Sequence, residues 1–92
     1  MKPSDFIPKA QELVANYTNK KLKAMFTNTM GLELLEPEDV YVVWSCKTLQ
    51  NSKAMLSTDI RDGMYYEVTY NGDKNEIYFD AYRKEHNEKV EV

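Results

Sequence analysis

The sequence has few of the residues that carry catalysis, metal binding or disulfide bonding. In 92 residues it contains one cysteine, one histidine, one tryptophan and three glycines. A single cysteine excludes an internal disulfide and any zinc site built from several cysteines, as is typical of proteins from a reducing compartment. No apolar run approaches the roughly 20 residues that span a bilayer, and the N-terminal residues lack the apolar stretch of a secretory signal. We therefore expect a cytoplasmic protein without membrane contact.

The composition is otherwise that of an ordinary globular domain. Apolar residues make up 42% and charged residues 29% of the chain, which excludes a disordered protein. A domain of this length has one small core, so a homodimer would add buried surface. The net charge of −3 is uneven, because residues 1–30 carry five lysines and two acids, leaving seven basic and 13 acidic residues for the rest. An acidic C-terminal two-thirds is unsuited to gripping phosphates, so long nucleic acid is not an expected partner.

Near the N-terminus, apolar residues follow the spacing of one face of an α-helix. They fall at i, i+4, i+7, i+8 and i+11, in the order Phe6, Ala10, Leu13, Val14 and Tyr17. Pro8 is tolerated only in the first helical turn, so Asp5 is the favoured N-cap, although the helix could also begin at Pro8 itself. From Met25 to Leu35 the periodicity weakens, which indicates a fraying helix end and a connection with Gly31 as the stop.

The stretch Val40–Lys47 is the most strand-like in the chain, because β-branched and aromatic residues dominate it. Strict alternation predicts that one face of this strand collects Val40, Val42, Trp44 and Cys46. A polar break at 50–52 separates it from a second alternating run at 53–58. A turn at 59–63 then leads into the last two strands.

Two alternating aromatic runs bracket Asn71-Gly72, a strong signal for a β-hairpin. A two-residue turn there would pair Tyr66 with Ile77 and would also oppose two glutamates. A longer loop through Lys74 pairs Val68 with Ile77 and avoids that like-charge pair, so we favour it. Both registers predict one apolar face made of Met64, Tyr66, Val68, Ile77, Phe79 and Ala81.

Together these elements predict an α+β fold, with an N-terminal amphipathic helix packed on a four-stranded antiparallel β-meander. We expect a single domain over 1–92, in which 1–35 form the helix and connection, 39–82 the sheet, and 83–92 a short charged helix or tail. Such a sheet leaves its second face open unless the tail or a partner covers it. On this face we expect Tyr41, Val43, Tyr65, Tyr78 and Tyr82 with Lys47, Glu67, Glu76 and Asp80.

Two segments of the sequence carry a resemblance to known proteins. They are Val43–Asn51, with the sequence VWSCKTLQN, and Asp62–Lys74, with the sequence DGMYYEVTYNGDK. The chain resembles a family of small uncharacterised proteins encoded by bacteriophages and prophages of Gram-positive bacteria, and the resemblance extends from the helix to Lys84. It implies a source and a size class. The family has no established activity, so the resemblance implies no catalytic residues.

The residue types that could carry chemistry each have a simpler structural interpretation. Cys46 could be a thiol activated by Lys47, but strand alternation puts the two on opposite faces, so we predict a buried core cysteine. His86 lies in the charged tail and is expected to be solvated. The spacing of Asp59, Asp62, Asp73 and Asp80 matches no calcium or zinc motif. We therefore expect no enzyme, no metal and no cofactor.

Seven tyrosines in so short a chain are the one compositional excess. Tyrosine is frequent in protein interfaces, although its high strand propensity is an alternative explanation. We predict a non-enzymatic phage or prophage accessory protein that binds a host or defence protein in the host cytoplasm. The predicted contact residues are Tyr41, Tyr65, Tyr78 and Tyr82, with Glu67 and Asp80 for electrostatic selectivity.

Two alternative functions remain open from the sequence. The first is an oligomer that sequesters a small signalling nucleotide by aromatic stacking and through the basic residues Lys20, Lys21, Lys23 or Arg61. The second is a purely structural protein.

Overall fold

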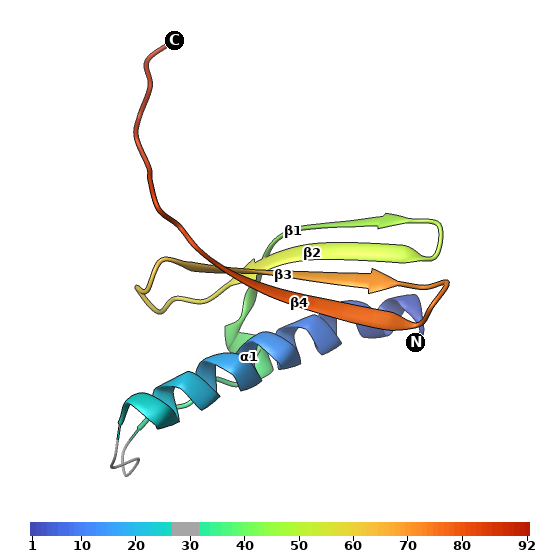
Figure 1. The fold of residues 1–92 in the computed structure, drawn as a ribbon, viewed down its shortest axis with the longest axis horizontal. Coiled ribbons are helices and arrows are strands. Elements are labelled where there is room, and N and C mark those ends of the chain that lie inside the picture. The colour runs from blue at the N-terminus through green and yellow to red at the C-terminus, as the bar shows by residue number, and fades with distance from the viewer. Residues whose placement is uncertain (27–31) are drawn as a thin grey trace.

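The computed structural model describes residues 1–26 and 32–92 and has one helix packed on one sheet (Figure 1). A short 3-10 turn, Pro3–Asp5, leads into helix α1, Phe6–Met25, and a second 3-10 turn, Pro37–Asp39, precedes the sheet. The strands are β1 (Tyr41–Thr48), β2 (Asn51–Ser57), β3 (Met64–Asn71) and β4 (Glu76–Arg83). All neighbours are antiparallel and the strand order is β1-β2-β3-β4. The predicted α+β fold, a helix on a four-stranded meander, is confirmed.

Helix α1 starts where the sequence places it. Pro8 lies in the first turn, where its missing N–H removes no helical hydrogen bond. The carboxylate of Asp5 accepts the backbone N–H of Lys2 at 3.2 Å, and therefore secures the 3-10 turn ahead of the helix. At the far end, the side chain of Asn19 makes two 2.8 Å hydrogen bonds, to the N–H and the C=O of Leu35. These bonds hold the returning chain against the helix.

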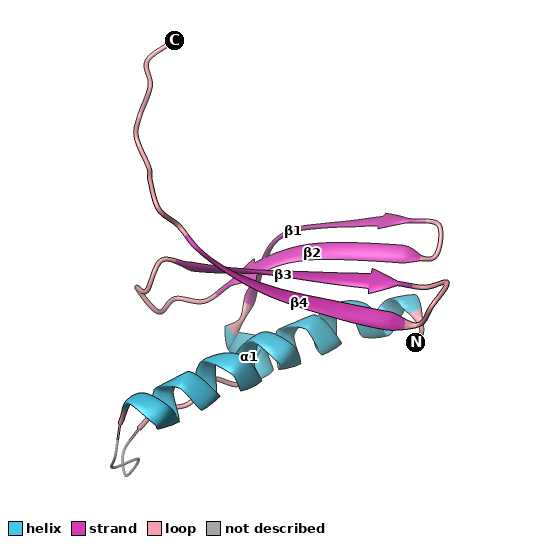
Figure 2. Ribbon diagram, in the orientation of Figure 1, coloured by secondary structure: helices cyan, strands magenta, loops and turns pink. Residues whose placement is uncertain are grey.

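The core lies between one side of the helix and one face of the sheet (Figure 2). The helix contributes a buried stripe at the predicted positions Phe6, Ala10 and Val14. Ala15 of the helix and Val40, just before β1, are also buried. Alternate residues of β2 and β3 form the sheet side of the core: Ala54, Leu56, Met64, Tyr66 and Val68. The predicted apolar hairpin face therefore points at the helix, although Ile77 and Phe79 at its β4 margin are only half-buried and Ala81 is exposed.

A β-bulge in β1 contradicts the predicted alternation of that strand. Val42 pairs with Leu56, but Trp44 pairs with Met55, so Val43 is an extra residue in β1. A single extra residue reverses the facing of every side chain that follows it. Trp44 and Cys46 therefore lie on the side away from the helix, and Cys46 is exposed. The predictions of a core cysteine and of one face shared by Val42 and Trp44 are wrong.

The β3–β4 hairpin also differs in register from the prediction. Asn71 pairs with Glu76 and Val68 with Phe79, which shifts β4 by two residues and keeps every side chain on its predicted face. The loop is Gly72 to Asn75, and Asn75 has a φ of 52°, in the left-handed region that asparagine tolerates. Asn71 accepts the backbone N–H of Asp73 at 3.1 Å, so its side chain shapes the loop.

Gly72 is needed for a close approach between two turns. A Cβ atom there would lie 2.1 Å from the carbonyl oxygen of Gln50, in the turn between β1 and β2. The side chain of Asn51 accepts the N–H of Gly72 at 3.1 Å across the same gap. The glycine of the Asn71-Gly72 signal therefore serves packing between neighbouring turns.

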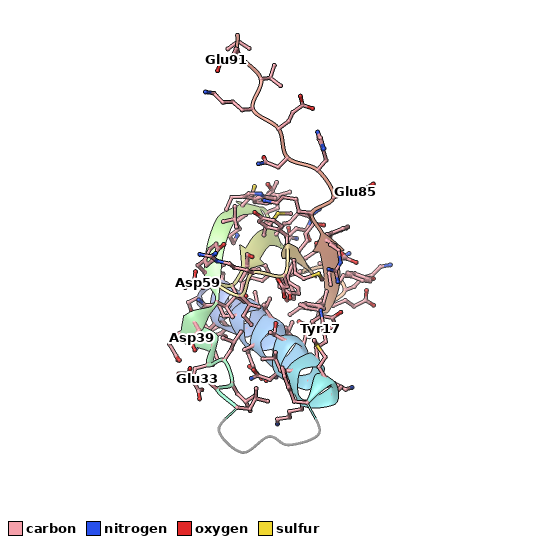
Figure 3. All side chains as sticks on the ribbon, turned by 90° about the vertical axis from the view of Figure 1, so that its left-hand side faces the viewer. Tyr17, Glu33, Asp39, Asp59, Glu85 and Glu91 are labelled. Atoms are coloured by element: carbon pink, nitrogen blue, oxygen red, sulfur yellow. The ribbon has the colours of Figure 1, made fainter. Side chains whose placement is uncertain are left out.

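The C-terminal segment after β4 is an extended tail without helical structure, which decides between the two predicted alternatives. In Figure 3 the sheet curves over the helix, and the tail that carries Glu85 and Glu91 leaves on the side away from the helix. Figure 1 shows the same tail running away from the strands, so it does not cover the sheet.

Candidate binding face

The face of the sheet opposite the helix is exposed and carries most of the aromatic side chains that the core does not use. We call it the open face, and its central residues are Tyr41, Trp44, Cys46, Lys53, Met55, Tyr65, Glu67, Thr69, Tyr78, Asp80 and Tyr82. The large side chains are 42 to 53% exposed at Tyr41, Trp44, Tyr78 and Tyr82. In contrast, Leu56, Tyr66 and Val68 on the helix side are at most 1% exposed.

Strand register arranges the open face in rows across the sheet. The middle row runs from Trp44 through Met55 and Glu67 to Asp80, because each residue pairs directly with the next. Tyr65 and Tyr82 form a cross-strand pair in the row beside it. The face thus grades from an apolar β1 side to an acidic and aromatic β4 side.

The centre of the acidic side contains two carboxylates directly opposite one another. Glu67 pairs with Asp80 in the ladder, and like charges in that position destabilise a sheet. Lys53 compensates in part, since its Nζ lies 3.7 Å from a Glu67 oxygen. The ion pairs of the described residues include none to Asp80. Its charge therefore remains available at the surface.

Two tyrosines of the open face contact charged side chains. The hydroxyl of Tyr78 donates a 2.7 Å hydrogen bond to Glu76, and this bond together with the Glu76 charge raises the pKa of Tyr78 above its ordinary value. Near the start of the tail, Lys84 Nζ lies 6.0 Å from the centroid of the Tyr65 ring, within cation–π range. Both contacts lie on the β4 side of the face.

All six predicted contact residues lie on the open face, but they form two groups. Tyr65, Tyr78, Tyr82, Glu67 and Asp80 gather on β3 and β4, whereas Tyr41 lies on the far edge strand. The prediction for Lys47 is wrong, because the bulge turns it to the helix side opposite Ser52. The bulge also brings Trp44 onto the open face, and no glycine marks it in the sequence. The run Val42-Val43-Trp44, which interrupts the apolar–polar alternation, is the only sign of it.

The basic residues proposed for nucleotide binding do not converge on a cavity. Lys20, Lys21 and Lys23 lie on the last turns of α1, while Arg61 lies between β2 and β3. Lys21 Nζ is 5.5 Å from the ring centroid of Tyr17 on its own helix. None of the four lines the hollow of about 330 Å³ between the helix N-terminus and the β1–β2 turn, or the similar one of about 340 Å³ beside Asp59.

Cys46 and His86 lie in unconnected environments. The Sγ of Cys46 is 3.9 Å from the hydroxyl of Thr48 on the same strand. His86 lies in the tail, where its Nε2 is 2.8 Å from a Glu88 oxygen. Within residues 1–26 and 32–92, no group of three His, Cys, Asp or Glu side chains is arranged to hold a metal ion.

The fold and the open face define a small two-layer α+β protein with one buried and one exposed sheet surface. Within the residues that the structure describes, no helix is both long enough and apolar enough to cross a membrane. The chain belongs to DUF6275, a family of unknown function whose pattern matches residues 7–92. The comparison with curated proteins found no match, and neither did the comparison with solved structures. Family membership therefore extends over the helix, the sheet and the tail without assigning an activity.

Proposed function

We propose that this chain is a non-enzymatic, cytoplasmic phage or prophage accessory protein that binds a host or defence protein through the open face. The observation that carries the proposal is the contrast between the two faces of one sheet. The helix buries one face, while the other exposes Tyr41 and Trp44 on β1 and Tyr78 and Tyr82 on β4. The phage or prophage origin rests on the resemblance of the segments Val43–Asn51 and Asp62–Lys74.

Aromatic residues on this face are suited to contact with a protein. Tyrosine and tryptophan bury a large area with few rotatable bonds and keep one polar atom for hydrogen bonding. Exposed apolar patches on small proteins usually mark interaction sites. The paired Tyr65 and Tyr82, with Tyr78 nearby, would form the centre of such a contact.

The charges of the open face indicate the kind of partner surface. Glu67 and Asp80 lie side by side, and among the described residues only Glu67 of the two has an ion pair, with Lys53. A lysine or arginine of the partner placed between the two carboxylates would relieve their repulsion, while the tyrosine rings beside them would stack on it. The partner is therefore expected to present a basic contact surface.

Affinity capture from a lysate of the bacterial host tests this proposal. The wild-type chain should retain a protein that is lost after combined Tyr65→Ala and Tyr78→Ala replacement, and also after Asp80→Lys. A double variant with Met25→Ala and Phe26→Ala removes two exposed apolar side chains at the end of α1, away from the open face, and should retain it. All variants are first checked for native circular dichroism.

The proposal is tested by comparing which variants lose the captured protein. A captured protein that survives both open-face variants would contradict the proposal, and so would one lost equally in the α1 control. Capture should also weaken as salt is raised, since screening reduces attraction between exposed charges.

A further inference from the structure

The two edges of the sheet differ in how well they are protected against pairing with another chain. Edge strands expose unpaired N–H and C=O groups, and proteins commonly disrupt such edges with bulges, prolines or lysines. Edge strand β1 contains the bulge at Val43. Edge strand β4 is eight residues long, pairs with β3 without a register shift and has neither proline nor lysine. The β4 edge is therefore the open one.

The hydrogen bonding of β4 shows which residues face that edge. The N–H of Lys84 donates to the C=O of Gly63, directly beyond the pair Met64 and Arg83. Because hydrogen-bonded and non-hydrogen-bonded pairs alternate in an antiparallel ladder, even-numbered residues of β4 bond to β3. The N–H and C=O groups of the odd-numbered residues, Ile77, Phe79, Ala81 and Arg83, therefore point away from the sheet.

The helix leaves the β4 margin of the core partly uncovered. Phe79 packs on Tyr17 of α1 with ring centroids 5.4 Å apart, yet Tyr17 is 37% exposed. Ile77 is half-buried and Ala81 exposed on the same side. Figure 3 places Tyr17 on the side of the helix next to β4. An apolar strip thus runs directly beside the unpaired backbone groups.

We propose that the β4 edge pairs with β4 of a second copy, in an antiparallel register centred on Phe79. A two-fold axis there makes the contact self-complementary. On the helix side, this register pairs Phe79 with Phe79 of the second copy, and Ile77 of each copy with Ala81 of the other. On the open face it pairs Tyr78 with Asp80 and Glu76 with Tyr82. The result is a continuous eight-stranded sheet with both helices on one side.

Charge selects this register over its neighbour. A register centred on Asp80 would also match the outward N–H and C=O groups, but it would place the two Asp80 carboxylates directly opposite one another. In the Phe79-centred register each carboxylate faces a tyrosine. In the single chain, the hydroxyl of Tyr78 donates to Glu76. In the dimer, Tyr82 of the second copy can donate to Glu76 instead, and the hydroxyl of Tyr78 is then free to donate to Asp80 of the second copy. Two donors and two acceptors are thereby matched in each half of the interface.

Light scattering on the full chain across a concentration series tests the pairing. The expected mass is twice the 10.8 kDa of one chain. Ala81→Lys puts an ammonium group into the apolar strip at an exposed position and should reduce the mass to that of one chain. Ser45→Lys, an exposed site on the helix side of the other edge strand, is the matched control and should leave the dimer intact. A monomer at every concentration, or a dimer that survives Ala81→Lys, would overturn the proposal.

Cysteine cross-linking tests the register. In a Cys46→Ser background, an equimolar mixture of Tyr78→Cys and Asp80→Cys chains should form more disulfide dimer than either chain alone. Stronger cross-linking of Asp80→Cys with itself would overturn the Phe79-centred register. The dimer and the proposed function share Tyr78 and Asp80, yet their failures can be told apart, because Ala81 lies on the helix side and its replacement leaves the open-face residues in place for partner capture.

Discussion

Tyr66 joins the helix to the sheet, and its replacement tests the account of the core. It is 1% exposed, its ring stacks on Phe79 with centroids 5.9 Å apart, and it makes an edge contact with Tyr17 at 5.8 Å. The hydroxyl of Thr18 donates to the Tyr66 hydroxyl oxygen at 3.4 Å. The side chain therefore combines a large packing role with one long hydrogen bond.

The two roles predict very different losses of stability. Tyr66→Phe keeps the ring and removes only the hydrogen bond, and a buried bond contributes about 0.5–1.5 kcal/mol. The 3.4 Å length favours the low end of that range. Tyr66→Ala removes the ring and leaves a cavity, which typically costs about 3–5 kcal/mol. Because small domains have unfolding free energies of about 5–15 kcal/mol, the alanine variant should be close to unfolding.

Urea denaturation followed by far-ultraviolet circular dichroism measures both losses. Tryptophan fluorescence is a poor reporter of this core, because Trp44 lies on the open face. Equal losses for Tyr66→Phe and Tyr66→Ala would refute the assignment of the stability to ring packing. A loss below about 1 kcal/mol for Tyr66→Ala would refute the burial itself.

High pH provides a second test of the same side chain. Burial raises the pKa of Tyr66 above its ordinary value, and the Thr18 hydrogen bond opposes this shift in part. The unfolded chain then loses this proton at lower pH than the folded chain. Stability is therefore fully present below about pH 10 and falls as the pH rises through the raised value, by up to about 1.4 kcal/mol per pH unit. Tyr66→Phe should show a smaller decrease.

Three further predictions concern the turns and the bulge. Asn19→Ala removes both hydrogen bonds to Leu35 and should lower the unfolding free energy by about 1–3 kcal/mol in urea titrations; an unchanged midpoint would contradict it. Gly72→Ala forces a Cβ against the Gln50 carbonyl and should lower the thermal midpoint, equivalent to about 1–3 kcal/mol, whereas an unchanged midpoint would refute the close approach. Cys46 should react fully with a thiol reagent in the native chain at nearly the rate seen in urea, and protection would disprove the bulge.

The sequence predicts the fold well because its main signals are local and consistent. The spacing of Phe6, Ala10 and Val14 identifies the buried side of the helix, and the alternation in β3 identifies the buried face of that strand. A register error of two residues does not change the side of the sheet to which each side chain points. The predicted apolar face of the hairpin is therefore correct, although Val68 pairs with Phe79 and not with Ile77. Periodicity thus determines which side of a strand is buried more reliably than it determines the pairing partner.

The failures arise where contacts distant in sequence decide the structure. The bulge at Val43 is fixed by how β1 lies along β2, and it moves Trp44 and Cys46 to the surface. The packing of Gly72 against Gln50 joins two turns that alternation treats separately. For the open face, the sequence identifies the tyrosines of β3 and β4 but misses the tryptophan, because only the bulge brings it there.

Replacement of Asp80 in the Glu67–Asp80 pair is expected to change stability and partner binding in opposite directions. Like charges directly opposite one another lower stability by up to about 1 kcal/mol relative to neutral pairs, so Asp80→Lys, which creates an opposite-charge pair with Glu67, should raise the urea midpoint. The proposed contact with a basic partner requires the same substitution to abolish capture. A chain that becomes more stable and loses its partner fits a face whose charges serve recognition. A chain that becomes more stable and still captures its partner would place the contact elsewhere.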